Sequence, residues 1–258
     1  MRQALPELPA EPTIDVWLIE LPTVSRLLLD APWPADSACG KLGAALALPH
    51  NDPSSRTDKA ETVTRVRRTV HLALRLLLAR SVGVTAAMQP FETGKTGKPR
   101  LPGGPAFSIS HSGERALIAL SRQGEVGVDI EAPRTIGMPA NRQAMIRCAG
   151  IAAKGGAMLA DGPPDAQTLQ AWVRLEAIAK YNGDGMGHLL GRLAIIGGAK
   201  PETITPATDG YTLQEIRLDR GYFASVAAPP GPWAVTLRRF PETREGVEGL
   251  MQGELRHR

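Results

Sequence analysis

Two carboxylates separated by one residue stand near the middle of the chain, in the segment GVDIE at 127–131. The apolar residues around them predict a strand, and because strand side chains alternate, Asp129 and Glu131 leave the same face. Two converging carboxylates without a basic neighbour repel each other unless a cation lies between them. Their hard oxygen atoms suit Mg²⁺, which completes its shell with water and substrate phosphates. A solvated edge strand would also explain the pair.

Another acidic side chain lies on a helix expected over about 167–181. Trp172, Glu176 and Lys180 follow at intervals of four residues, which places them along one helix face. Glu176 would give a metal its third carboxylate, and the Lys180 ammonium would bind a phosphate. A buried Trp beside a surface Glu–Lys pair is the simpler interpretation.

A third group of candidates is Ser110-His111-Ser112-Gly113, in an expected turn between two strands. Adjacent side chains point apart on a strand, and no G-x-S-x-G motif surrounds them, so a nucleophilic Ser–His pair is not predicted. A histidine beside two hydroxyls fits anion binding better. The nearby Gly94-Lys95-Thr96 is no Walker A loop, because Gln89 stands where that motif needs glycine.

The clearest predicted element is a helix over about 59–81, with Gly83 as its stop. Aliphatic residues recur there every three or four positions and predict one buried stripe: Val63, Val66, Val70, Leu74 and Leu77. Arg68, His71 and Arg75 follow the same spacing on a neighbouring face. Long basic side chains on one face could clamp a phosphate, and a solvated helix face is the alternative.

Strands are expected at 14–21, on either side of the 111–114 turn, and at 125–130, 210–217, 222–228 and 233–238. Residues 31–58 are interpreted as loop with a short helix near 40–48. The Ala/Gly-rich residues 135–169 are ambiguous. Residues 241–258 are expected to form a mobile, charged tail.

Composition narrows the class of protein. The 258 residues are 43% hydrophobic, enough for one large core or two smaller ones, and the net charge of +4 suits an anionic substrate or acidic partner better than DNA. Cys39 and Cys148 form neither a CxxC pair nor a zinc spacing. No apolar run is long enough to span a membrane, and residues 1–12 lack a signal sequence. A cytoplasmic enzyme is expected, without nucleic acid or membrane as partner.

Four segments in order resemble the 4′-phosphopantetheinyl transferase superfamily: GKP at 97–99, FSISHSG at 107–113, GVDIE at 127–131 and WxxxEAxxK at 172–180. The length resembles the monomeric surfactin-synthetase-activating (Sfp-type) branch. The resemblance covers about 97–183. It implies an α+β fold of two similar halves with pseudo-twofold symmetry and the active site in the cleft between them. The halves are expected at 1–123, with the basic helix, and 124–258, with the carboxylates and charged tail.

The resemblance also implies an activity: transfer of the phosphopantetheine arm of coenzyme A to a serine of an apo acyl, polyketide or peptidyl carrier protein, with release of adenosine 3′,5′-bisphosphate. Asp129, Glu131 and Glu176 would bind Mg²⁺. Glu176 would also take the serine proton, directly or through water. The other implied contacts are Lys180 to a phosphate oxygen, Ser110 and His111 to the 3′-phosphate side, Lys98 near the nucleotide, and Arg68, preferred over Arg67 and His71, on the basic helix.

Two departures from the family pattern leave alternatives open. Leu175 stands where many members have lysine, and residues 145–150 lack an aromatic pair that helps relatives engage their carrier. The chain could be a degenerate member that binds coenzyme A or a carrier without turnover. It could also be a magnesium-dependent nucleotide phosphohydrolase with water as nucleophile. The retained carboxylates and Lys180 favour an active transferase.

Overall fold

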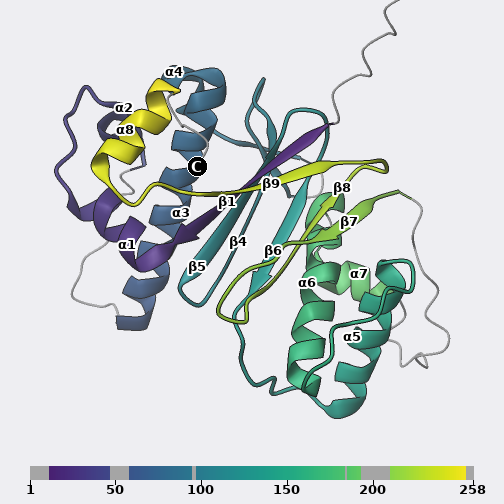
Figure 1. The fold of residues 1–258 in the computed structure, drawn as a ribbon. Helices are drawn as coiled ribbons and strands as arrows, with labels where there is room; N and C mark the ends of the chain where they lie inside the picture. Colours follow the sequence, from purple (N-terminus) through teal and green to yellow (C-terminus); the bar gives the residue numbers. More distant parts are fainter. Residues whose placement is uncertain (1–11, 47–57, 95–96, 184, 193–209, 254–258) are drawn as a thin grey trace, which may run out of the picture.

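The computed structural model describes residues 12–46, 58–94, 97–183, 185–192 and 210–253. Strands in this part of the chain form a four-stranded, a three-stranded and a two-stranded sheet. Helices gather at both ends of the molecule, and the two larger sheets lie between them (Figure 1). This architecture agrees with the predicted α+β class. No helix in the described ranges is long and apolar enough to cross a membrane.

The four-stranded sheet has the order β4-β5-β1-β9. Its strands are β1 (Thr13–Glu20), β4 (Ala106–Ser112), β5 (Arg115–Ser121) and β9 (Ala234–Arg239). β1 pairs antiparallel with β5 and parallel with β9. Because side chains alternate, Trp17 and Ile19 join the core under the helices, while Val16 and Leu18 pack toward the second sheet. The nearly continuous apolar run of β1 therefore reflects burial on both faces.

Helix α3 (Asp58–Val82) covers the outer face of this sheet. It confirms the helix predicted over 59–81, and Val70, Leu74 and Leu77 of the predicted stripe are buried. Val63 is 44% exposed, so the buried stripe begins later than predicted. Gly83 follows with a φ of 85°, a backbone conformation that favours glycine.

The second sheet has the antiparallel order β6-β8-β7, built from β6 (Gly127–Glu131), β8 (Phe223–Ala228) and β7 (Thr212–Glu215). Helix α6 (Pro164–Asn182) packs against it. A Cβ atom at Gly127 would come within 2.0 Å of the Ala177 carbonyl oxygen. Glycine at the start of β6 therefore lets α6 approach the strand that carries the central carboxylates.

Residues left ambiguous by the sequence include helix α5 (Ala140–Ala153), which packs on α6. A Cβ atom at Gly150 would come within 2.5 Å of Ala171, so the two helices touch through their smallest side chains. Such an interface lacks the large aliphatic residues that produce a visible helical stripe. The remaining elements are α1 (Leu21–Ser25), the π-helix η1 (Arg26–Asp30), α2 (Ala38–Ala45), α4 (Val84–Ala87), β2 (Glu92–Thr93), β3 (Pro99–Arg100) and α7 (Met186–Arg192).

The end of the chain returns to the first sheet. After β9, helix α8 (Arg244–Gln252) is capped at its N-terminus by Thr243, whose side chain accepts a hydrogen bond from Gly246 N–H. Val247 and Leu250 are buried in the same core as α3. The sequence predicted a mobile, charged tail over 241–258, whereas residues 244–252 form a helix. Its two buried apolar residues lie among charged neighbours and therefore give no clear helical stripe. Residues 254–258 lie outside the described part.

A buried arginine links the first sheet to the loop between β7 and β8. Arg115 is fully buried and forms ion pairs with Glu20 at 2.9 Å and Asp219 at 2.6 Å. Its guanidinium also lies over the Tyr222 ring, 4.8 Å from the ring centroid. Arg115 therefore holds β1 and β5 against a segment about 100 residues later in the chain.

Candidate active site

A cleft of about 590 Å³ opens between α3, β4, β6 and α6. Its wall collects side chains from both larger sheets and from the helix on each side of them: Arg67, Val70, His71, Ile109, Ser110, His111, Asp129, Ile130, Glu131, Glu176 and Lys180. Most of the residues selected from the sequence therefore meet in one place, although they come from four separate segments.

Asp129 is the most buried carboxylate of the cleft, with 4% of its surface exposed. Its Oδ1 accepts hydrogen bonds from Lys180 Nζ at 2.7 Å and from Ser110 Oγ at 2.6 Å. Burial raises the pKa of Asp129 most strongly, Lys180 and Ser110 oppose that rise, and Glu131 adds to it. A buried, partly neutralised carboxylate of this kind favours a nearby cation.

Glu131 faces the cleft beside Asp129 but has different partners. Ser112 Oγ donates to Glu131 Oε2 at 2.8 Å, and Arg134 Nη2 donates to Oε1 at 3.2 Å. Arg134 was not assigned to the site from the sequence, and Ser112 was named there only as one of two hydroxyls beside His111, with no role at the carboxylates. The alternation of serines along β4 was a usable signal for Ser112, since it matches the spacing of Asp129 and Glu131. Expected as part of a turn, His111 and Ser112 instead lie in β4.

Glu176 lies on the α6 wall, one turn before Lys180. Burial raises the pKa of its carboxyl group, and repulsion from Asp129 and Glu131 raises it further, whereas Lys180 and a hydrogen bond with Trp172 lower it. The surroundings therefore destabilise the ionised form of the Glu176 carboxyl group, as is typical of a proton acceptor or a cation ligand.

We expect Glu176→Gln to stabilise the metal-free protein at neutral pH. Because the pKa of the Glu176 carboxyl group is raised in the fold, the folded protein binds this proton more tightly than the unfolded chain does. The resulting stabilisation is complete below the ordinary pKa of 4.5 and is lost as pH rises through the raised pKa of the folded state. Melting in EDTA at pH 7.5 is expected to show a gain of about 2–4 °C, equivalent to about 1 kcal/mol. The gain should shrink toward pH 4.5. Exposed Glu92→Gln is the control, and an unchanged Tm at pH 7.5 would contradict the expectation.

His71 and His111 contribute neutral imidazoles to the cleft. Burial lowers the pKa of His111, and the positive charges of Lys180 and Arg67 lower it further. The pKa of His71 falls because of burial and the charges of Arg75 and Arg67. Both rings can donate one N–H to an anion near neutral pH, while the permanent positive charge comes from Arg67 and Lys180.

The basic face expected on α3 separates into different environments. Arg67, Arg68 and His71 are all exposed, but of the three only Arg67 and His71 line the cleft. Arg75 is buried, donates to the Ala87 and Gln89 carbonyl oxygens, and lies over the Phe91 ring. Arg75 therefore satisfies backbone carbonyl groups at the end of α4 and just after it. Arg67 occupies the place in the cleft for which the sequence favoured Arg68.

Lys98 lines a smaller adjoining cavity of about 270 Å³, which shares Ile109 and Lys180 with the main cleft. Its ammonium pairs with Glu125 at 2.9 Å and donates to the Val126 carbonyl oxygen at 2.7 Å. Burial lowers the pKa of Lys98, and Glu125 opposes that change. Its charge is therefore largely neutralised within the protein.

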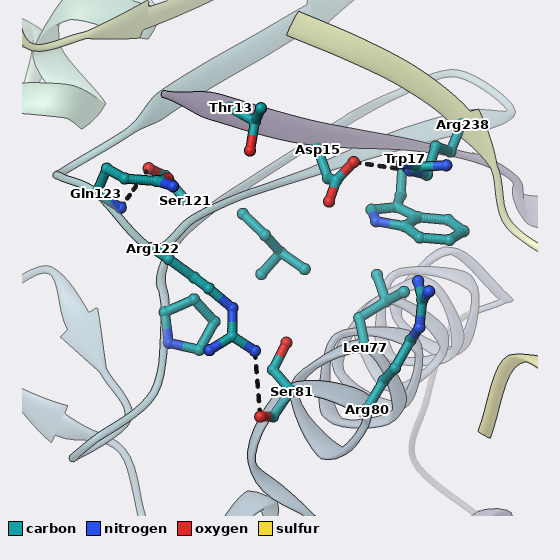
Figure 2. Close-up of a pocket in the computed structure, with 12 residues that line it drawn as sticks. Thr13, Asp15, Trp17, Leu77, Arg80, Ser81, Ser121, Arg122, Gln123 and Arg238 are labelled. Atoms are coloured by element: carbon teal, nitrogen blue, oxygen red, sulfur yellow. Dashed lines mark hydrogen bonds and ion pairs between the residues drawn. The ribbon is translucent and has the colours of Figure 1, made fainter. Parts of the chain in front are cut away.

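Another cavity, of about 350 Å³, lies beside β1 and the end of α3 (Figure 2). Arg238 pairs with Asp15 at 2.7 Å, and Arg122 donates to the Ser81 carbonyl oxygen. Asp15 is the carboxylate among its lining residues and is already paired. Because this cavity gathers no converging carboxylates, the cleft around Asp129 is the candidate reaction site.

The cleft residues suit a hard cation in their chemistry. Asp129, Glu131 and Glu176 supply oxygen donors, and their mutual repulsion would fall if a cation lay between them. Within the described ranges, however, no three His, Cys, Asp or Glu side chains form a compact metal-ligand cluster. Glu131 Oε2 accepts from Ser112 and Oε1 from the exposed Arg134, so binding a metal through all three carboxylates would require Oε1 to exchange Arg134 for the metal.

Comparison with known proteins finds similarity over parts of the chain. Over 67 residues it is 43% identical to a Synechocystis sp. protein provisionally named 4′-phosphopantetheinyl transferase, covering 24% of this chain and 27% of that protein. The 4′-phosphopantetheinyl transferases AcpT of Salmonella typhimurium and Salmonella typhi are 34% and 33% identical over 128 and 129 residues. Each alignment covers 48% of this chain and 64% of the relative, so less than two thirds of each relative is matched. No family model matches the chain.

Proposed function

We propose that the chain is a 4′-phosphopantetheinyl transferase that uses coenzyme A and Mg²⁺ to modify a serine of a carrier protein. The observation that carries this proposal is the meeting of Asp129, Glu131, Glu176 and Lys180 in one cleft with the basic wall of α3. The names of the partial relatives support the same activity. A cytoplasmic location, with carrier protein and coenzyme A as partners, belongs to the proposal.

The proposed reaction makes an O–P bond to the carrier serine and breaks the P–O bond that joins the arm's phosphate to adenosine bisphosphate. Magnesium held by Asp129, Glu131 and Glu176 would offset the negative charge that develops on the leaving phosphate. Glu176 accepts the serine proton, directly or through water, and its surroundings make it a stronger base than an exposed glutamate. No covalent bond to this chain is needed, because the partner supplies the nucleophile.

The remaining cleft residues position the coenzyme. Lys180 donates to a phosphate oxygen while it stays in contact with Asp129. Arg67 of α3 and His111 of β4 bind the 3′-phosphate side. Lys98 borders the adjoining cavity, where its aliphatic stem packs beside the nucleotide. Catalysis in this arrangement rests on positioning and charge, as is usual for transfer of a phosphoryl-type group.

We further propose the Sfp-type branch and its division into two related halves, 1–123 and 124–258. Chain length supports the branch. The halves are supported by two sheets, each covered by one long helix, α3 and α6, with the cleft between them. Strand β9 and helix α8 belong to the second half in sequence but pack with the first.

The activity is tested by incubating the protein with coenzyme A, Mg²⁺ and a panel of apo acyl, polyketide and peptidyl carriers. Intact-mass spectrometry should show one added phosphopantetheine group on at least one carrier. Carriers whose modified serine is replaced by alanine are the control. Release of adenosine 3′,5′-bisphosphate without a carrier would favour the phosphohydrolase instead. Coenzyme binding without any mass change would favour a degenerate member.

We expect Arg67→Gln to raise the KM for coenzyme A about tenfold while changing kcat little, because a charge-assisted hydrogen bond to phosphate contributes about 1.5–3 kcal/mol. Arg68→Gln is expected to have a smaller effect, since Arg68 does not line the cleft. Arg80→Gln, an exposed arginine of the same helix, is the control. Steady-state kinetics at fixed carrier concentration measure all three. A larger rise in KM for Arg68→Gln would contradict the placement of Arg67.

A further inference from the structure

Three serines at alternate positions of β4 face β6 across the seam between the two larger sheets. Ser108 Oγ accepts a hydrogen bond from Val128 N–H at 3.1 Å, and Ser112 Oγ accepts one from Ala132 N–H at 3.0 Å. β4 and β6 belong to different sheets. Side-chain hydroxyls therefore satisfy backbone N–H groups of β6 and of the residue after it, where a neighbouring strand would normally supply carbonyls.

Two of these serines also contact the carboxylates of β6 in register. Ser110 pairs with Asp129 and Ser112 pairs with Glu131, at distances of 2.6 and 2.8 Å. Both strands present their side chains at intervals of two, so one serine is matched to one carboxylate. Ser108, the third member, contacts no carboxylate among the described residues.

The hydrogen atoms of this seam have defined directions. A serine hydroxyl has one proton to donate. At Ser112 the Ala132 N–H supplies the hydrogen on one side, so the hydroxyl proton is directed to Glu131 Oε2. Asp129 Oδ1 accepts from both Ser110 and Lys180, and no hydrogen bond from the described residues reaches Oδ2. One carboxylate oxygen is thus held while the other is left for a cation in the cleft.

We propose that Ser110 and Ser112 are positioning residues that orient Asp129 and Glu131 for a divalent cation. This inference rests on the proposed function for the identity of the cation. It changes the part given to Ser110 by family resemblance, because its hydroxyl proton goes to Asp129 and not to the coenzyme. It also adds Ser112, for which the resemblance implied no role.

The test is binding of Mn²⁺, used as a spectroscopic substitute for Mg²⁺ and measured by electron paramagnetic resonance without coenzyme or carrier. Loss of a hydrogen bond that orients a metal ligand typically lowers affinity about 10–100-fold. Ser110→Ala and Ser112→Ala are expected to weaken Mn²⁺ binding by about tenfold or more. Ser112→Thr, which keeps a hydroxyl, should restore most of the affinity.

Ser108→Ala is the matched control, because it removes a hydroxyl of the same seam that touches only the Val128 backbone. It is expected to lower thermal stability and to leave Mn²⁺ affinity nearly unchanged. Equal losses of affinity for Ser108→Ala and Ser112→Ala would overturn the inference, as would a wild-type protein that binds no Mn²⁺. If Ser112→Ala does not fold, Ser110→Ala and Ser112→Thr give the same comparison.

Failure of this inference and failure of the proposed function are distinguishable. A protein that binds Mn²⁺ in the expected serine-dependent way, yet modifies no carrier and releases no nucleotide, supports the positioning role and contradicts the transferase. A protein that modifies carriers while Ser110→Ala and Ser112→Ala retain full Mn²⁺ affinity supports the transferase and overturns the positioning role.

Discussion

Replacing Glu176 with glutamine is expected to slow carrier modification by about 100- to 10,000-fold, the range over which a positioned general base contributes to a rate. Glutamine keeps the size of the side chain on α6 but cannot accept the serine proton. It also removes one of the three carboxylate charges, with those of Asp129 and Glu131, that would hold the proposed Mg²⁺. Single-turnover assays with a saturating carrier, followed by intact mass, measure the step directly.

The comparison needs a variant that changes an equivalent charge elsewhere on the same helix. Asp165→Asn serves this purpose, because Asp165 lies in the first turn of α6, far along the helix from the cleft residues. It should transfer the arm at close to the wild-type rate. If Glu176→Gln retained more than about a tenth of the wild-type rate, the rate loss would be far smaller than the contribution of a general base. The proton acceptor would then have to be another group.

Replacing Arg115 with methionine is expected to lower the free energy of unfolding by about 3–5 kcal/mol, the usual cost of removing one partner from a buried ion pair. The substitution leaves Glu20, whose side chain is 15% exposed, without its 2.9 Å partner, and it releases the β7–β8 loop at Asp219. Arg220 and Arg239 lie 3.9 and 3.6 Å from Glu20 and replace that contact only in part. Urea unfolding followed by circular dichroism measures the loss.

A second substitution separates the loss of the ion pair from the loss of packing. Glu20→Gln in the Arg115→Met background should recover part of the stability, because the uncompensated buried charge is then removed. Arg239→Met, at a position with 62% of its side chain exposed, should cost well under the Arg115 value. A loss below about 1 kcal/mol for Arg115→Met, the size of an exposed pair, would show that the link between sheet and loop is weak.

Elements whose burial follows a regular period were predictable from local sequence. Helix α3, helix α6 and the strands around the carboxylates carry large aliphatic residues at helical or alternating spacing, and the structure places them close to the expected residues. The ends of the two helices were predictable too, because glycine follows each of them. Gly83 and Gly183 adopt positive φ values, which other residues avoid. These signals act within a few residues and need no knowledge of the rest of the fold.

Helices that bury small or sparse side chains were not predictable in this way. Helix α5 meets α6 through Gly150 and Ala171, and α8 contributes Val247 and Leu250 to the first core from a charged segment. In both cases the stabilising contact is made with residues distant in sequence. A window of sequence that contains no aliphatic stripe gives no indication of such a partner.

The same division holds for the candidate site. Residue types and spacing alone determined that Asp129 and Glu131 share a strand face and that Glu176 and Lys180 share a helix face, because alternation and helical periodicity are local geometry. Only the tertiary structure decided that these faces meet in one cleft, that Arg67 and not Arg68 lines it, and that Glu125 neutralises Lys98. It also decided that the β4 serines hold the carboxylates, since their hydrogen bonds join strands of different sheets. Charge and burial depend on what packs against a side chain from elsewhere in the chain, and spacing along one segment carries no record of that partner.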